Sequence, residues 1–89
     1  MATKQSRLRT ETLPPLRYVE HLLQGHGDIT LGRVEDHPCV ATAADEDQQL
    51  AMLVRRKGET LAELLVRLDQ AIESAYECRH VINEVYGPG

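Results

Sequence analysis

The chain has 89 residues, which leaves room for one hydrophobic core but not for two. Hydrophobic residues make up 42% of it, too many for a disordered chain, although Trp and Phe are absent and three Tyr are the only aromatic residues. No apolar run approaches the ~20 residues of a membrane-spanning helix, and no secretion leader opens the sequence. We therefore expect one small cytoplasmic domain over 13–89, with no membrane partner and a core of Leu, Val and Ala.

The net charge of −4 is unevenly distributed along the chain. The first 17 residues carry four basic residues and one acidic residue, a net charge of +3, and the rest of the chain carries −7. Residues 1–12 show neither helical nor strand periodicity, which predicts a flexible basic tail. Such a tail can contact phosphate backbones, but an acidic body repels nucleic acid, so a solvated terminus is the favoured interpretation.

The first predicted element is a short helix that Leu13-Pro14-Pro15 opens, because proline is tolerated in a first helical turn. Gly25 and Gly27 are expected to end it. Its apolar side chains share one side at helical spacing: Leu16, Val19, Leu22 and Leu23. A helix this short needs a packing partner.

Three strands are predicted next, at 29–34, 39–43 and 49–55, separated by turns at 35–38 and 45–47. The third strand is apolar on both faces: Leu50, Met52 and Val54 lie on one, and Ala51 and Leu53 on the other. A strand of this kind needs cover on both faces, and the short first helix is the only local candidate for the second face.

The clearest element is a helix over 61–77. Thr60 and Glu63 have the spacing of a capping box, and Glu63 is also placed to pair with Arg67 one turn later. A continuous apolar stripe follows the cap: Leu61, Leu64, Leu65, Leu68, Ala71, Ile72, Ala75 and Tyr76.

A last strand is predicted over 80–86, before Gly87. A helical crossover would make it parallel to the third strand, but its position in the sheet stays open. The fold class is α+β: a short N-terminal helix, a small and mostly antiparallel sheet, one long amphipathic helix and a final strand.

Two short pairs, His37-x-Cys39 and Cys78-x-His80, supply the ligand types of a Cys₂His₂ zinc site. The two residues of each pair would point to the same side of a strand. The alternative is that the cysteines are small buried hydrophobic residues in a reducing compartment. We favour the alternative, because the spacing is not that of zinc fingers, and we predict no metal and no other cofactor.

Catalysis and phosphate binding are not favoured either. The basic run 55–57 precedes a helix N-terminus, which can attract an anion, but ordinary solvation is the favoured explanation, because Glu59 and Glu63 already lie at that end of the helix. The acidic residues at 45–47 are adjacent in a turn, and His21 and His26 have no matched acid. A domain this small rarely encloses a catalytic pocket, so the protein is not expected to be an enzyme.

The residues from Gly58 to Ile72, beginning Gly-Glu-Thr-Leu-Ala-Glu-Leu, resemble the helix start of HicB-type antitoxins. The order of three strands, a helix and a strand is similar too. The resemblance implies a small partner-binding regulator, and no functional residue is carried over from it.

The sequence therefore predicts a non-enzymatic interaction module, either a homodimer or a partner of another protein. The reason is that the third strand is apolar on both faces and the chain offers too few apolar residues to cover both. The side chains expected to take part in the interaction are Leu16, Val19, Leu22, Leu23, Leu50, Met52 and Val54. The alternative is a small regulator that acts on nucleic acid or as an antitoxin-like protein.

Overall fold

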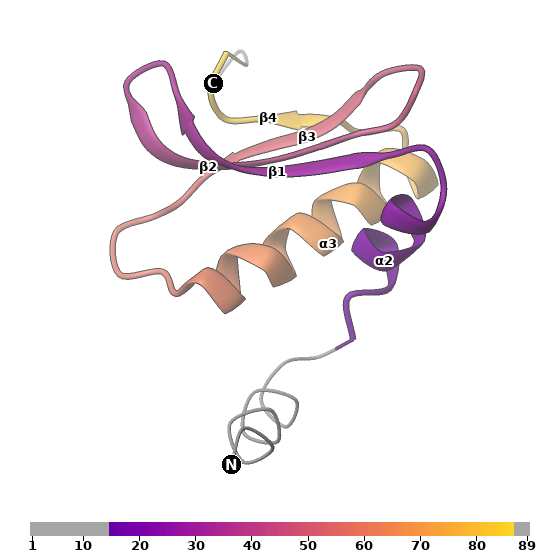
Figure 1. Ribbon diagram of the computed structural model, residues 1–89, viewed down its shortest axis with the longest axis horizontal. Coiled ribbons are helices and arrows are strands. Elements are labelled where there is room, and N and C mark those ends of the chain that lie inside the picture. The colour runs from indigo at the N-terminus through magenta and orange to yellow at the C-terminus, as the bar shows by residue number, and fades with distance from the viewer. Residues whose placement is uncertain (1–14, 87–89) are drawn as a thin grey trace.

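The computed structural model describes residues 15–86. The predicted basic tail, the Leu13-Pro14 helix start and residues 87–89 lie outside this range. The elements follow one another as α2 (Arg17–Gln24), β1 (Asp28–Val34), β2 (His37–Ala44), β3 (Gln49–Val54), α3 (Leu61–Glu77) and β4 (Ile82–Asn83) (Figure 1). This order confirms the predicted α+β class.

The four strands form one sheet in the order β1-β2-β3-β4. β1 with β2, and β2 with β3, pair antiparallel through short turns. β4 pairs parallel to β3, with Ala51 opposite Ile82 and Met52 opposite Asn83. The sheet is therefore mixed, and the parallel pair is the consequence of the α3 crossover.

Both described helices lie on the same face of the sheet (Figure 1). The strands present small residues to this face, with Ala41 opposite Leu53 and Ala43 opposite Ala51, so α3 can pack close against the sheet. The core that results includes Leu64, Leu68 and Ile72 of α3, which are fully buried. Within 15–86, every buried residue is apolar.

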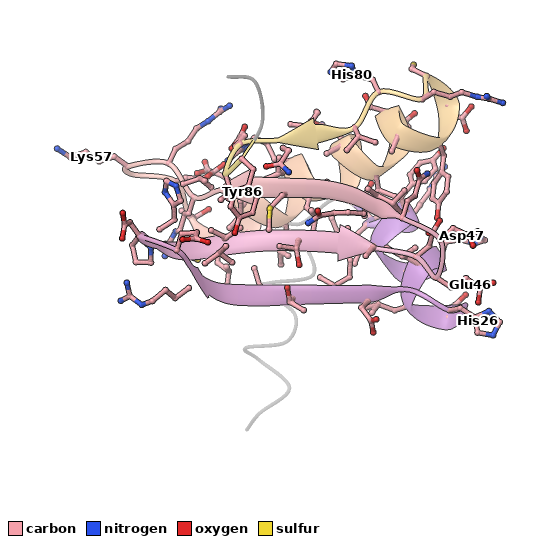
Figure 2. The ribbon with its side chains drawn as sticks, turned by 90° about the horizontal axis from the view of Figure 1, so that it is seen from above. His26, Glu46, Asp47, Lys57, His80 and Tyr86 are labelled. Atoms are coloured by element: carbon pink, nitrogen blue, oxygen red, sulfur yellow. The ribbon has the colours of Figure 1, made fainter. Side chains whose placement is uncertain are left out.

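The expectation that the short helix covers the second face of the sheet is wrong, because α2 packs beside α3. On that second face, Val40 and Met52 are nevertheless only 0% and 8% exposed. Figure 2, seen from above, shows Tyr86 reaching over the sheet, and its hydroxyl donates to Glu35 Oε2 in the β1–β2 turn at 2.8 Å. The segment after β4 therefore supplies cover that the sequence analysis assigned to α2 or to a partner.

The first turn of α2 is capped by a residue from another helix. Its N-cap residue, Leu16, offers no side-chain hydrogen bond. Instead, Asp69 of α3 accepts the backbone N–H groups of Tyr18 and Val19 on one carboxylate oxygen, at 2.8 and 2.9 Å. The carboxylate also faces the positive end of the helix dipole. This single side chain fixes where α2 starts and ties it to α3.

The predicted helix over 61–77 and its capping box are confirmed. Thr60 Oγ1 accepts the N–H of Glu63 at 3.1 Å, and Glu63 Oε1 accepts the N–H of Thr60 at 2.9 Å. The predicted pair of Glu63 with Arg67 is wrong, because the cap occupies the Glu63 carboxylate and Arg67 has other partners.

The final strand is much shorter than predicted, two residues in place of 80–86. Arg79 has a positive φ of 57° and turns the chain after α3, so pairing begins only at Ile82. Beyond Asn83 one more backbone bond forms, from the Glu84 N–H to the Met52 carbonyl at 2.7 Å, and side chains then bind Val54: Glu84 Oε1 accepts its N–H at 2.9 Å, and Arg67 donates to its carbonyl at 2.9 Å. The backbone N–H and C=O groups of Val54, at the end of β3, therefore have hydrogen-bond partners although β4 is short.

Candidate functional site

The densest polar constellation in the described residues surrounds Arg67, whose side chain is only 18% exposed. Its guanidinium donates to both carboxylate oxygens of Glu59, through Nε at 2.8 Å and Nη2 at 3.0 Å. Nη1 donates to Glu84 Oε2 at 3.0 Å. We call Arg67, Glu59 and Glu84 the arginine cluster. The bidentate geometry is the strong form of a charged hydrogen bond.

The arginine cluster joins three segments that are distant in sequence. Glu59 comes from the loop before α3, Arg67 from the second turn of α3, and Glu84 from the residue after β4. The hydrogen bonds from Arg67 lower the pKa of the Glu59 carboxyl from 4.5 to about 2. The same contacts raise the pKa of Arg67 above its ordinary value, so both groups stay charged at neutral pH.

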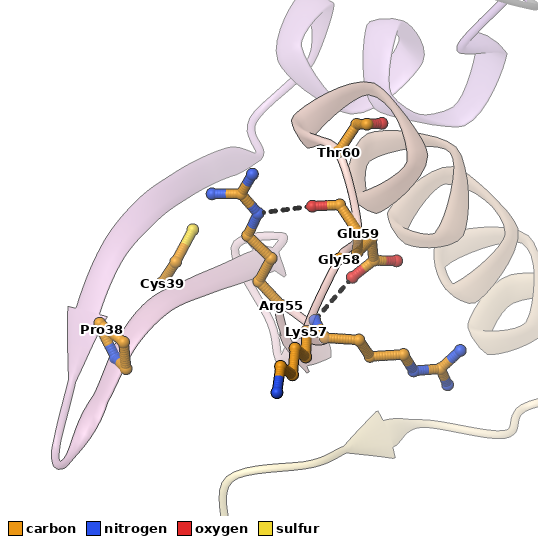
Figure 3. A pocket seen from close by; sticks show the side chains of 8 residues that line it. Pro38, Cys39, Arg55, Lys57, Gly58, Glu59 and Thr60 are labelled. Carbon is orange, nitrogen blue, oxygen red and sulfur yellow. Dashed lines mark hydrogen bonds between the residues drawn. The ribbon is translucent and has the colours of Figure 1, made fainter.

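Beside the arginine cluster lies an open hollow of about 770 Å³ (Figure 3). The residues that line it come from the start of β2 and the loop into α3: Pro38, Cys39, Arg55, Arg56, Lys57, Gly58, Glu59 and Thr60. This is the place where the basic run and the helix N-terminus suggested an anion site.

In the loop before α3, the carboxylate of Glu59 lies where an external anion could bind. Glu59 Oε1 accepts the backbone N–H of Arg56 at 2.9 Å, and the Glu59 carbonyl accepts Arg55 Nε at 2.9 Å (Figure 3). Gly58, at φ 80°, makes the turn that brings Glu59 back onto the loop. The Glu59 carboxylate therefore occupies one backbone donor of this loop, and the Glu59 carbonyl occupies Arg55 Nε.

The lowered pKa of Glu59 predicts how the stability of the fold depends on pH in the acidic range. A carboxylate whose pKa falls on folding stabilises the fold at any pH above about 4.5, and this contribution disappears as the pH falls toward 2. We expect the stability difference between the parent and Glu59→Gln, measured by urea unfolding at pH 6, 4 and 2.5, to shrink across that window. A difference that stays constant would contradict the prediction.

The two His/Cys pairs are not brought together. Cys39 lines the hollow beside Lys57, whereas Cys78 and His80 follow the far end of α3, and Figure 2 places Lys57 and His80 at opposite ends of the molecule. Among residues 15–86, no group of three or more His, Cys, Asp or Glu side chains could hold a metal ion.

The cysteines differ in their environments. Cys39 is half-buried and packs against the core, as expected for a small hydrophobic residue. The expectation that Cys78 is buried is wrong: it is the exposed C-cap of α3, and its N–H bonds the Ser74 carbonyl. The chain turns away from the core at Arg79, which leaves Cys78 on the outside.

The acidic residues in the β2–β3 turn also have a structural role. Asp45 Oδ1 accepts the N–H groups of Asp47 and Gln48, both at 2.8 Å, and Asp45 Oδ2 accepts the Tyr76 hydroxyl at 3.1 Å. The bonds from the backbone lower the pKa of Asp45. His26 lies 3.8 Å from Glu46, and both are exposed. The expectation that His26 has no matched acid is therefore wrong, and these side chains line a shallow hollow of about 200 Å³ beside the turn.

The side chains predicted to mediate interaction are mostly used by the fold. Val19, Leu22, Leu50 and Met52 are buried. Leu16 and Val54 are half-buried. Leu23, 55% exposed on α2, is the member that remains open to a partner.

Within residues 15–86, β1 forms one edge of the sheet, a position that the residue pattern alone does not indicate. Five of the seven residues of this strand are exposed, among them Leu31 at 44%. Leu31 lies opposite Ala41, which is fully buried, so an exposed apolar side chain stands at the edge of the sheet next to a core residue. The alternation Ile29-x-Leu31 signals an apolar face, but only the strand order shows that β1 ends the sheet.

No model of a known protein family, no curated protein and no solved structure matches this chain. The resemblance to HicB-type antitoxins therefore gains no support from these comparisons. In the part of the chain that the structure describes, neither helix has the length and apolar character needed to cross a bilayer.

Proposed function

We propose that the protein is a non-enzymatic interaction module that associates with itself as a homodimer. The observation that carries the proposal is β1, a seven-residue strand at the edge of the sheet with an exposed leucine in its middle. An edge strand offers unpaired N–H and C=O groups to a further strand, and edges that must stay single are commonly protected by charged residues, proline or bulges. In β1 the charged residues Asp28 and Arg33 and the bulge lie toward the ends, and the central stretch 29–31 contains none of these features.

The polar groups that could serve catalysis support the non-enzymatic part of the proposal. Glu59 and Arg67 bind each other in the arginine cluster, and Asp45 binds its own turn. A general acid or base needs a free proton site facing a substrate, and these carboxylates direct their lone pairs to partners within the chain. The two free cysteines agree with a cytoplasmic location, which we include in the proposal.

Light scattering on the purified full-length protein tests the homodimer. The expected result is a particle of twice the 10.0 kDa chain mass at micromolar concentration, converting to the monomer on dilution. A mass of one chain across the whole micromolar range would reject self-association.

A further inference from the structure

We infer that the dimer forms through β1, which pairs antiparallel with β1 of a second copy about a twofold axis at Thr30. The two sheets then join into one continuous sheet across both chains. This inference rests on the proposed homodimer and names its surface and register.

The regular part of β1 limits the registers that can form. Asp28–Gly32 pairs with β2 residue by residue, and the register shifts between Gly32 and Val34. Five residues therefore form a straight ladder, and alternate residues of this stretch direct N–H and C=O groups away from β2. A second strand can add to this stretch, whereas the bulge bends the chain beyond it.

Side-chain chemistry selects the register within this stretch. In a twofold antiparallel pair, opposite residues lie on the same face of the sheet. A centre at Thr30 sets Ile29 against Leu31 twice, on the face that already carries Ala43 and Ala41 opposite these two residues. The exposed leucine of each chain then packs on an apolar residue of the other, and the core continues across the interface.

The opposite face of the sheet is compatible with the same centre. Asp28 lies opposite Gly32, where an added Cβ would meet no atom within 4 Å, so the aspartate has room. A centre at Leu31 would instead oppose Ile29 with Arg33. Residues of β1 therefore fit the same residues of an antiparallel second β1, which favours a second copy of this chain over a different partner.

Matched lysine substitutions test the surface. Leu31 and Val81 are both 44% exposed, but Val81 lies away from β1, between α3 and β4. We expect Leu31→Lys to raise the dimer dissociation constant about tenfold or more, because the symmetric dimer loses two apolar pairs and gains two charges. Val81→Lys should leave it unchanged. Circular dichroism and thermal unfolding of both variants establish that each remains folded.

A crosslink tests the register. In a background with Cys39→Ala and Cys78→Ser, Thr30→Cys places two thiols opposite each other at the axis, within disulfide reach. Mild oxidation should yield a covalent dimer, whereas Asp47→Cys, at the far turn, should not. A parent that dimerises, resists Leu31→Lys and forms no Thr30→Cys crosslink would overturn this inference and leave the homodimer standing. A monomeric parent would overturn both.

Discussion

Replacing Arg67 with Gln is expected to lower the free energy of unfolding by about 3 kcal/mol, because four charge-assisted hydrogen bonds are lost and the Glu59 carboxylate, which has little contact with solvent, loses its counter-charge. Glu59, with 9% of its side chain exposed, would lose both of its guanidinium bonds. Glu84 and the Val54 carbonyl would each lose one, although Glu84 would keep its own bond to the N–H of Val54. For a domain of this size the loss corresponds to a melting point lower by roughly 10–20 °C.

Urea unfolding at neutral pH measures the effect, and Arg56→Gln is the matched control. Arg56 also approaches Glu84, at 3.9 Å, but two thirds of its side chain is exposed. An exposed pair of this kind contributes about 0–1 kcal/mol, so the control should unfold close to the parent. Equal losses in the two variants would mean that the arginine cluster contributes no more than surface charge does.

Gly27→Ala is expected to cost about 1–3 kcal/mol through overpacking at the end of α2. An added Cβ at Gly27 would meet the Leu22 side chain and lie 2.9 Å from the Leu22 carbonyl oxygen. Leu22 is buried and cannot swing into solvent. The same carbonyl accepts the Gly27 N–H at 3.1 Å, so a shift of the backbone would also weaken that bond.

Gly25→Ala provides the comparison two residues earlier. Gly25 has a negative φ of −99°, and the atoms nearest to an added Cβ are the carbonyl oxygens of His21 and Leu22, at 3.7 and 3.9 Å. This is ordinary van der Waals contact, so the cost at Gly25 comes from the backbone alone, whose ψ of −127° lies outside the α and β regions and costs an alanine about 1 kcal/mol. Thermal unfolding of the two variants compares this cost with that at Gly27. A Gly27→Ala variant as stable as Gly25→Ala would show that the contact with Leu22 adds no cost.

The features that the sequence predicted correctly depend on local signals. The capping box places both of its partners within four residues, so Thr60 and Glu63 marked the start of α3 without knowledge of the fold. The strands from β1 to β3 follow from apolar runs separated by turn residues. The crossover helix then accounts for the parallel placement of β4 beside β3.

The incorrect predictions concern partners that only the topology brings together. Glu63 stands at the favourable spacing from Arg67, yet Glu59 and Glu84 bind the guanidinium, from eight and 17 positions away. The same applies to β1. Its side chains are visible in the sequence, but whether a strand lies at the edge or in the centre of a sheet depends on the strand order, which residue patterns did not settle. The candidate interface therefore had to come from the structure.

The cap that Asp69 provides has a consequence for the order of events during synthesis. α2 has eight residues, and a helix that short does not persist alone in water. The carboxylate that completes its first turn is encoded 51 positions after Tyr18. The ribosome therefore releases the α2 segment early, but the segment gains its helical form only after α3 has emerged. Among residues 15–86, the helix that is translated first therefore receives its cap only after the second helix has been made.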